Sequence, residues 1–102
     1  MNIVVYTTCP DEDVAKRISK TVVEQRLAAC VHRFNAGMSV FEWEGRIEEE
    51  AEVLLMIKTK EKLYAGLEEA ILANHPYDVP EIIATNIDQG LPAYLRWIDH
   101  LD

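Results

Sequence analysis

Residues 30–59 have the sequence CVHRFNAGMSVFEWEGRIEEEAEVLLMIKT and predict a long β-hairpin. Both arms, Cys30–Trp43 and Arg46–Thr59, have the extended character of strands. Glu44-Gly45 between them is a turn signal, and Ala36-Gly37 interrupts the first arm. The pattern therefore predicts two antiparallel strands joined by a tight turn.

The hairpin is longer than the elements around it. Each arm has 14 residues, which corresponds to roughly 45 Å at about 3.3 Å per residue. A helix over residues 14–26 covers only about 20 Å. We therefore expect the distal half of the hairpin, with Phe41, Trp43 and Ile47, either to overhang its own domain or to bend sharply at Ala36-Gly37.

The segments on either side of the hairpin predict the remaining elements. Before it lie a compact apolar strand at 2–8 and an amphipathic helix for which Asp11 is the expected N-cap. After it come a helix at 60–74, a strand at 80–87 and a closing helix that starts near Pro92. The order βαββαβ plus a terminal helix predicts a single α+β domain over 1–102, a ferredoxin-like sandwich with a four-stranded antiparallel sheet.

Two of the predicted strands carry apolar residues on both faces. Val4 and Tyr6 alternate with Ile3 and Val5 in the first strand, and the apolar run 53–57 does the same in the third. Two helices can cover one face of the sheet, and the closing helix is too short to cover the other. Because bare apolar faces usually mark interfaces, an oligomer is expected. The alternative is a hairpin that folds back on its own chain.

Composition excludes several classes of partner. The hydrophobic content of 49% is typical of an ordered globular protein. The net charge of −8, with Lys and Arg scattered among acids, argues against nucleic acid and an anionic membrane as partners. The first residues lack a basic signal-peptide region, and their apolar run is too short to span a bilayer, so a cytoplasmic location is expected.

The predicted topology gathers several polar side chains at one edge of the sheet. Cys9, Asp11, His75 and Glu81 meet there, whereas Cys30 starts at the opposite edge, so both cysteines are expected as free thiols. Cys9 precedes a helix N-terminus, where the dipole favours thiolate, and thiolate with imidazole suits Cu or Zn. There are two alternatives. Cys9 has only a packing or capping role, or it is a nucleophile with His75 as its base.

Two further features point less directly to function. Glu48, Glu49, Glu50 and Glu52 have the character of a hard-cation site, although such a run is more often a solvated edge or a source of salt bridges. Lys58 follows an apolar run on a central strand and needs a carboxylate or a ligand if it is buried. The chain has no Gly-rich phosphate loop, no Ser-His-Asp spacing and no CxxC motif.

Several blocks of the sequence resemble the CutA divalent-cation-tolerance family. They are LAACV at 27–31, WEGRIE at 43–48, EVLL at 52–55 with Lys58-Thr59, and HPYDVPEII at 75–83. The resemblance covers nearly the whole chain, from Val4 to Ile98. It implies a ferredoxin-like subunit in a tight homotrimer with hairpins that cross between subunits, a likeness to the PII signalling proteins, and a role in tolerance of divalent cations, particularly copper.

The resemblance also implies where a cation and a small molecule would bind. The positions of the family's proposed copper ligands are Thr7, Asn74 and His75 in this chain, so only His75 keeps a ligand. Cys9, two residues after Thr7, is a candidate substitute. Four residues are expected to line clefts between subunits: Trp43, Lys58, Tyr77 and Glu81.

The resulting hypothesis is a non-enzymatic, cytoplasmic homotrimer that binds divalent metal, copper in particular, through His75 with Cys9 or Glu81. No other cofactor is implied. The first alternative is a PII-like signalling trimer that binds a small molecule in the inter-subunit clefts near Lys58 and Tyr77. An enzyme that uses Cys9 ranks last.

Overall fold

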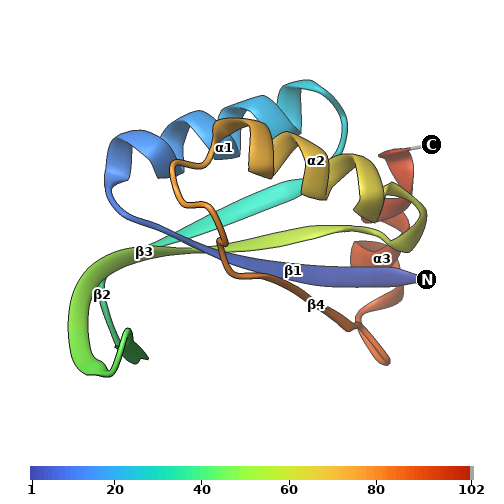
Figure 1. Cartoon of the computed structure of the whole chain (residues 1–102). Helices are drawn as coiled ribbons and strands as arrows, with labels where there is room; N and C mark the ends of the chain where they lie inside the picture. Colours follow the sequence, from blue (N-terminus) through green and yellow to red (C-terminus); the bar gives the residue numbers. More distant parts are fainter. Residues whose placement is uncertain (102) are drawn as a thin grey trace.

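The computed structural model describes residues 1–101 and confirms the predicted order of elements (Figure 1). Strand β2 is one arm of the hairpin and β3 the other, and the predicted second helix begins with a 3₁₀ turn. The elements are β1 Asn2–Cys9, α1 Glu12–Glu24, β2 Cys30–Trp43, β3 Arg46–Lys60, a 3₁₀ turn Glu61–Leu63, α2 Tyr64–Asn74, β4 Ile82–Asn86, α3 Pro92–Ile98 and a 3₁₀ turn Asp99–Leu101.

The four strands form one antiparallel sheet in the order β2-β3-β1-β4. Helices α1 and α2 lie side by side on one face of this sheet, as the split βαβ arrangement requires (Figure 1). The predicted α+β ferredoxin-like class is therefore confirmed. Within residues 1–101, no helix is long and apolar enough to cross a bilayer.

The core lies between the sheet and the two helices. Alternate residues of β1 are buried against the helices, and the helices bury Ile18, Leu67 and Ile71 completely. The predicted N-cap of α1 is confirmed, because an Asp11 carboxylate oxygen accepts the backbone N–H of Val14 at 2.9 Å. This cap fixes where the chain turns from β1 into α1.

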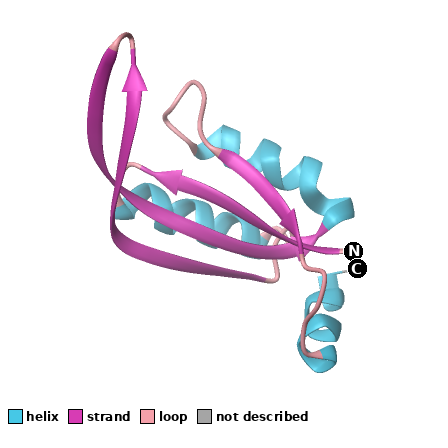
Figure 2. Ribbon diagram, turned by 90° about the horizontal axis from the view of Figure 1, so that it is seen from below, coloured by secondary structure: helices cyan, strands magenta, loops and turns pink. Residues whose placement is uncertain are grey.

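Two backbone irregularities shape the hairpin. Glu44 and Gly45 both have positive φ, 51° and 80°, as a two-residue type I′ turn requires. The pairing of β2 with β3 shifts register between Phe34 and Gly37, and Ala36 in between has φ 64°. The predicted break is thus a β-bulge, and the hairpin bends away from the helical layer beyond it (Figures 1 and 2).

The bent part of the hairpin does not fold back on the core of its own chain. Its large apolar side chains stay open to solvent, with Trp43 58% and Ile47 73% exposed. The hairpin therefore both bends and overhangs, and the alternative of a hairpin packed on its own chain does not hold.

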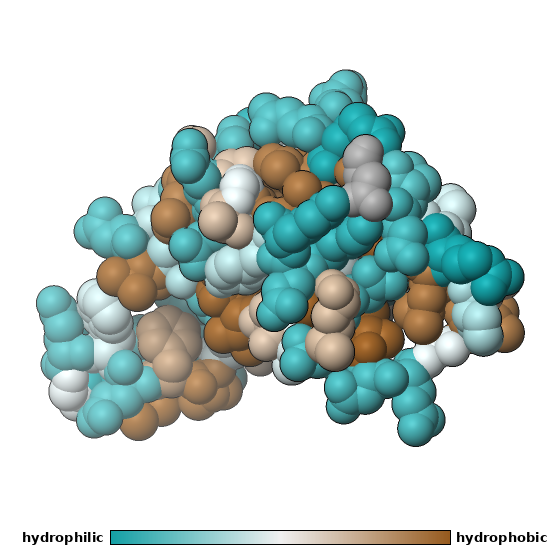
Figure 3. Space-filling model, turned by 90° about the vertical axis from the view of Figure 1, so that its right-hand side faces the viewer, coloured by the Kyte–Doolittle hydropathy of each residue, from teal (hydrophilic) through white to brown (hydrophobic). Residues whose placement is uncertain are grey.

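The sheet face opposite the helices, which we call the helix-free face, is largely uncovered. It carries apolar side chains from all four strands that are half-buried or exposed: Val4, Tyr6, Phe34, Leu54, Met56 and Ile83. Helix α3 lies at one end of the sheet, near both termini, and leaves the rest open (Figure 2). In Figure 3, apolar side chains gather along the lower half of the surface, on the side away from the helical layer.

Helix α3 is held at that end by specific contacts. The Asn2 side-chain amide donates to the Leu95 carbonyl at 3.2 Å, and the Lys60 ammonium lies 3.9 Å from an Asp99 carboxylate oxygen. Ile98, the last residue of α3, and Leu101 in the following 3₁₀ turn are both buried. A helix of seven residues covers only about 10 Å, which is why most of the helix-free face stays bare.

Candidate functional site

His75 ends helix α2 and lies close to the end of β1. Pro76 follows it, and the residue before a proline is pushed out of the helical region, so His75 is extended with φ −100° and ψ 133°. Its side chain is only 8% exposed. Ring atom Nε2 lies 2.7 Å from the Thr8 carbonyl oxygen, and Nδ1 accepts the backbone N–H of Tyr77 at 3.2 Å. Because Nδ1 accepts, Nε2 is the donor to the Thr8 carbonyl, and both nitrogens are occupied by the protein.

Cys9 is the last residue of β1 and lies on the helix-facing side of the sheet. Its thiol is fully buried. Burial, followed by the charges of the nearby Glu52 and Asp11 carboxylates, raises the pKa of this thiol to about 11. The expectation that the helix dipole favours thiolate is therefore wrong, because burial outweighs the dipole. At neutral pH Cys9 carries its proton and is a poor metal ligand.

Glu52 joins the hairpin to the loop after α2. The Ser39 hydroxyl donates to one carboxylate oxygen of Glu52 at 2.5 Å, and the Tyr77 hydroxyl donates to the other at 3.2 Å. The Tyr77 ring also packs against the His75 ring, with 4.8 Å between centroids. The sequence placed Glu52 in an acidic run and missed this role, since no local pattern connects positions so far apart in the chain.

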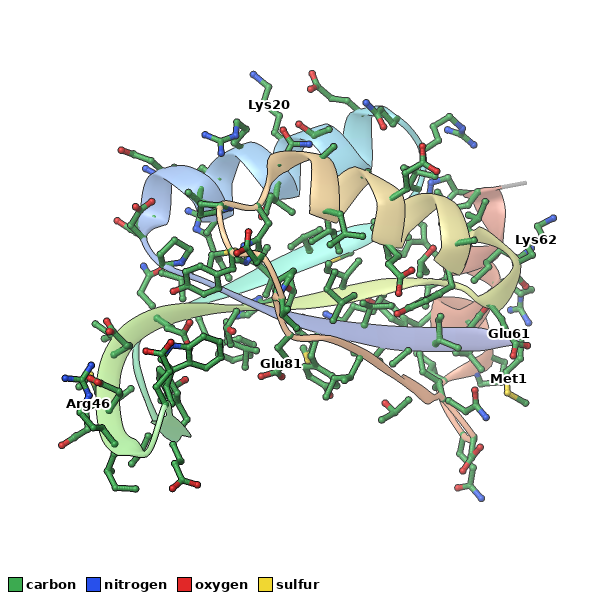
Figure 4. The ribbon with its side chains drawn as sticks, in the orientation of Figure 1. Met1, Lys20, Arg46, Glu61, Lys62 and Glu81 are labelled. Carbon is green, nitrogen blue, oxygen red and sulfur yellow. The ribbon has the colours of Figure 1, made fainter. Side chains whose placement is uncertain are left out.

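Glu81 lies on the other side of the sheet from Cys9. The next residue, Ile82, packs against the core beside Thr7. Because side chains alternate along a strand, the Glu81 side chain lies on the same side as Ile83, on the helix-free face. Figure 4 shows Glu81 below the sheet, away from the helical layer. Although the topology brings Glu81 to the predicted edge, it does not bring its carboxylate to the buried Cys9 thiol.

The residues expected to line inter-subunit clefts are widely separated within one chain. Trp43 lies beside the hairpin turn, opposite Arg46, which Figure 4 shows at the far end of the molecule. Lys58 is half-buried and pairs in register with Cys30 and Val4. Lys58 lies six positions along β3 from Glu52, the partner of Tyr77, which corresponds to about 20 Å. One subunit alone therefore does not assemble this set.

The donor set at His75 has suitable chemistry but is engaged by the protein. No group of three or more His, Cys, Asp or Glu side chains in residues 1–101 is arranged to hold a metal ion. Thr7 is fully buried, and the Asn74 side chain donates to the Ala70 carbonyl at 2.9 Å. In this arrangement, neither position supplies a ligand beside His75, and the site does not fit a divalent cation unless His75 is released.

Thr7→Val is expected to stabilise the fold by about 1 kcal/mol, because the buried Thr7 hydroxyl has no hydrogen-bond partner among the described residues. Thr59 is the matched control: it is equally buried on the next strand, but its hydroxyl donates to the Leu27 carbonyl at 2.7 Å. Thr59→Val should lower stability by about 1 kcal/mol. Urea unfolding at equal protein concentration measures both changes in stability. Equal changes for the two variants would contradict the assignment of Thr7 as a buried hydroxyl without a partner.

Known proteins resemble this chain over nearly its whole length. The family model of the CutA1 divalent ion tolerance protein matches residues 3–100. Protein CutA of Mus musculus is 50% identical over 93 residues, which are 91% of this chain and 52% of that protein. The divalent-cation tolerance protein CutA of Thermus thermophilus is 44% identical over 98 residues, 96% of this chain and 95% of that protein.

The likeness extends to solved structures. The crystal structure of CutA1 from Oryza sativa superposes with a TM-score of 0.96 at 44% identity, and the match covers 98% of this chain and 92% of that one. The chain spans about half the length of the mouse relative and nearly all of the Thermus protein.

Proposed function

This chain belongs to the CutA1 divalent ion tolerance family, and on that premise we propose that it serves divalent-cation tolerance as a non-enzymatic, cytoplasmic homotrimer that binds copper through His75. The observation that carries the proposal is the family match across residues 3–100. A net charge of −8 favours the approach of cations to the surface.

The uncovered surfaces support assembly into an oligomer. Apolar side chains of all four strands lie open on the helix-free face, where Phe34 is 41% and Ile83 53% exposed. The overhanging hairpin adds Trp43 and Ile47 to the apolar surface that one chain cannot cover. A second and third copy of the chain are the partners proposed for this surface, and the number three rests on the family.

His75 supports the choice of ligand because its imidazole is the one ligand retained at the family's proposed copper positions. Imidazole is a good ligand for Cu and Zn. Cys9 and Glu81 are the proposed additional ligands, and both need rearrangement to reach His75: Cys9 is buried and protonated, and Glu81 lies below the sheet.

Isothermal titration of the protein with Cu²⁺ and Zn²⁺ tests the proposal. We expect a copper site tighter than surface carboxylates provide, lost in His75→Ala and weakened in Cys9→Ser. His100→Ala is the control, because His100 is an exposed histidine in the C-terminal 3₁₀ turn. Absence of binding, or equal binding by His75→Ala and His100→Ala, would remove the proposed site.

A further inference from the structure

We propose that Tyr77 and Glu52 form a latch that keeps His75 closed, so that a cation reaches the imidazole only when the hydrogen bond between these two side chains opens. This inference rests on the proposed function, since it concerns regulation of the same site. Tyr77 and Glu52 are positioning residues here: neither one is a ligand, and both act through the ring of His75.

His75 has no free ring nitrogen. Nε2 donates to the Thr8 carbonyl at 2.7 Å, and the lone pair of Nδ1 accepts the Tyr77 N–H at 3.2 Å. A metal ion binds an imidazole through a nitrogen lone pair. Binding at Nδ1 therefore requires the Tyr77 backbone to move away from the ring.

Tyr77 is held at three points. Its backbone N–H donates to His75, its ring packs on the His75 ring, and its hydroxyl donates to Glu52 at 3.2 Å. The first two contacts hold Tyr77 to the histidine itself. The third contact anchors Tyr77 to strand β3. The hydroxyl is therefore the contact that prevents Tyr77 and its loop from moving away from this strand.

The Glu52 carboxylate that anchors Tyr77 is firmly held, whereas the loop around Tyr77 is not. Ser39 on β2 donates to the same Glu52 carboxylate at 2.5 Å, which fixes its orientation. By contrast, within the single chain Tyr77 is 39% and Val79 84% exposed, and a loop with so few contacts to its own chain opens easily once its hydrogen bond is lost.

Ethoxyformylation of histidines by diethyl pyrocarbonate, read by peptide mass spectrometry, tests the latch without metal. The reagent attacks an unprotonated ring nitrogen, so it reports access to Nδ1 of His75. In Tyr77→Phe the ring stays and only the hydroxyl is lost. We expect the labelling rate of His75 to rise about tenfold, the ratio expected for loss of a hydrogen bond to a charged group.

The chain offers a matched control in Tyr64→Phe. Tyr64 also donates to a glutamate, Glu68, at 2.9 Å, but both lie on α2 and the pair does not touch His75. Tyr64→Phe should leave His75 labelling unchanged, with His100 as the internal reference in every sample. Equal labelling of His75 in wild type and Tyr77→Phe would overturn the latch, and so would an equal rise in Tyr64→Phe.

Addition of Cu²⁺ to the labelling reaction separates the latch from the proposed function. Protection of His75 by copper, stronger in Tyr77→Phe than in wild type, supports both. If labelling rises in Tyr77→Phe but copper gives no protection, the latch stands and the copper site at His75 is wrong. If copper protects His75 equally in both proteins, the site stands and the latch is overturned.

Discussion

Leu54→Glu is expected to dissociate the oligomer into single chains. Leu54 lies on the inner strand β3, half-buried on the helix-free face, between Thr8 on β1 and Phe34 on β2. In the proposed assembly this face is covered by other copies of the chain, and a carboxylate there would be buried without a partner. Such a charge costs about 3–5 kcal/mol, and the cost recurs in every subunit.

Leu72→Glu is the control for this experiment because it makes the same change on the opposite side of the molecule. Leu72 is 49% exposed on α2, in the helical layer. Size-exclusion chromatography with light scattering should give single chains for Leu54→Glu and an unchanged oligomer for Leu72→Glu. A wild-type protein that already runs as a single chain would contradict both the prediction and the proposed trimer.

Leu67→Ala is expected to lower the free energy of unfolding by about 3 kcal/mol, within the range of about 2–5 for such truncations. Leu67 is fully buried between α2 and the sheet, and removal of its side chain leaves a cavity in the core. Because the proposed assembly would make stability depend on concentration, wild type and variant are compared by chemical denaturation at equal protein concentration.

Leu72→Ala controls for the change of residue within the same helix. Its side chain is half exposed, so its truncation should shift stability by less than about 0.5 kcal/mol. Similar losses for Leu67→Ala and Leu72→Ala would mean that α2 is not seated on the sheet as described.

The sequence alone determined the order of elements and the position of the hairpin turn. The alternation of side chains along a strand predicts that Ile3 and Val5 share one face of β1 and Val4 and Tyr6 the other, because neighbouring residues of a strand point to opposite faces. Asp11 predicts the start of α1, and Glu44-Gly45 predicts a turn, because both depend on backbone geometry within a few residues. Ala36-Gly37 predicts a break for the same reason, although not that it is a β-bulge.

Only the tertiary structure decided the state of the candidate site. The partners of His75 and Tyr77 come from β1 and β3, and the separation in sequence between Tyr77 and Glu52 leaves no local signal for their hydrogen bond. The protonation of Cys9 also escaped prediction, because it depends on how deeply the thiol is buried, whereas the sequence shows only its place before a helix. Which side chains meet across elements, and how far each is removed from water, is a property of the packed fold.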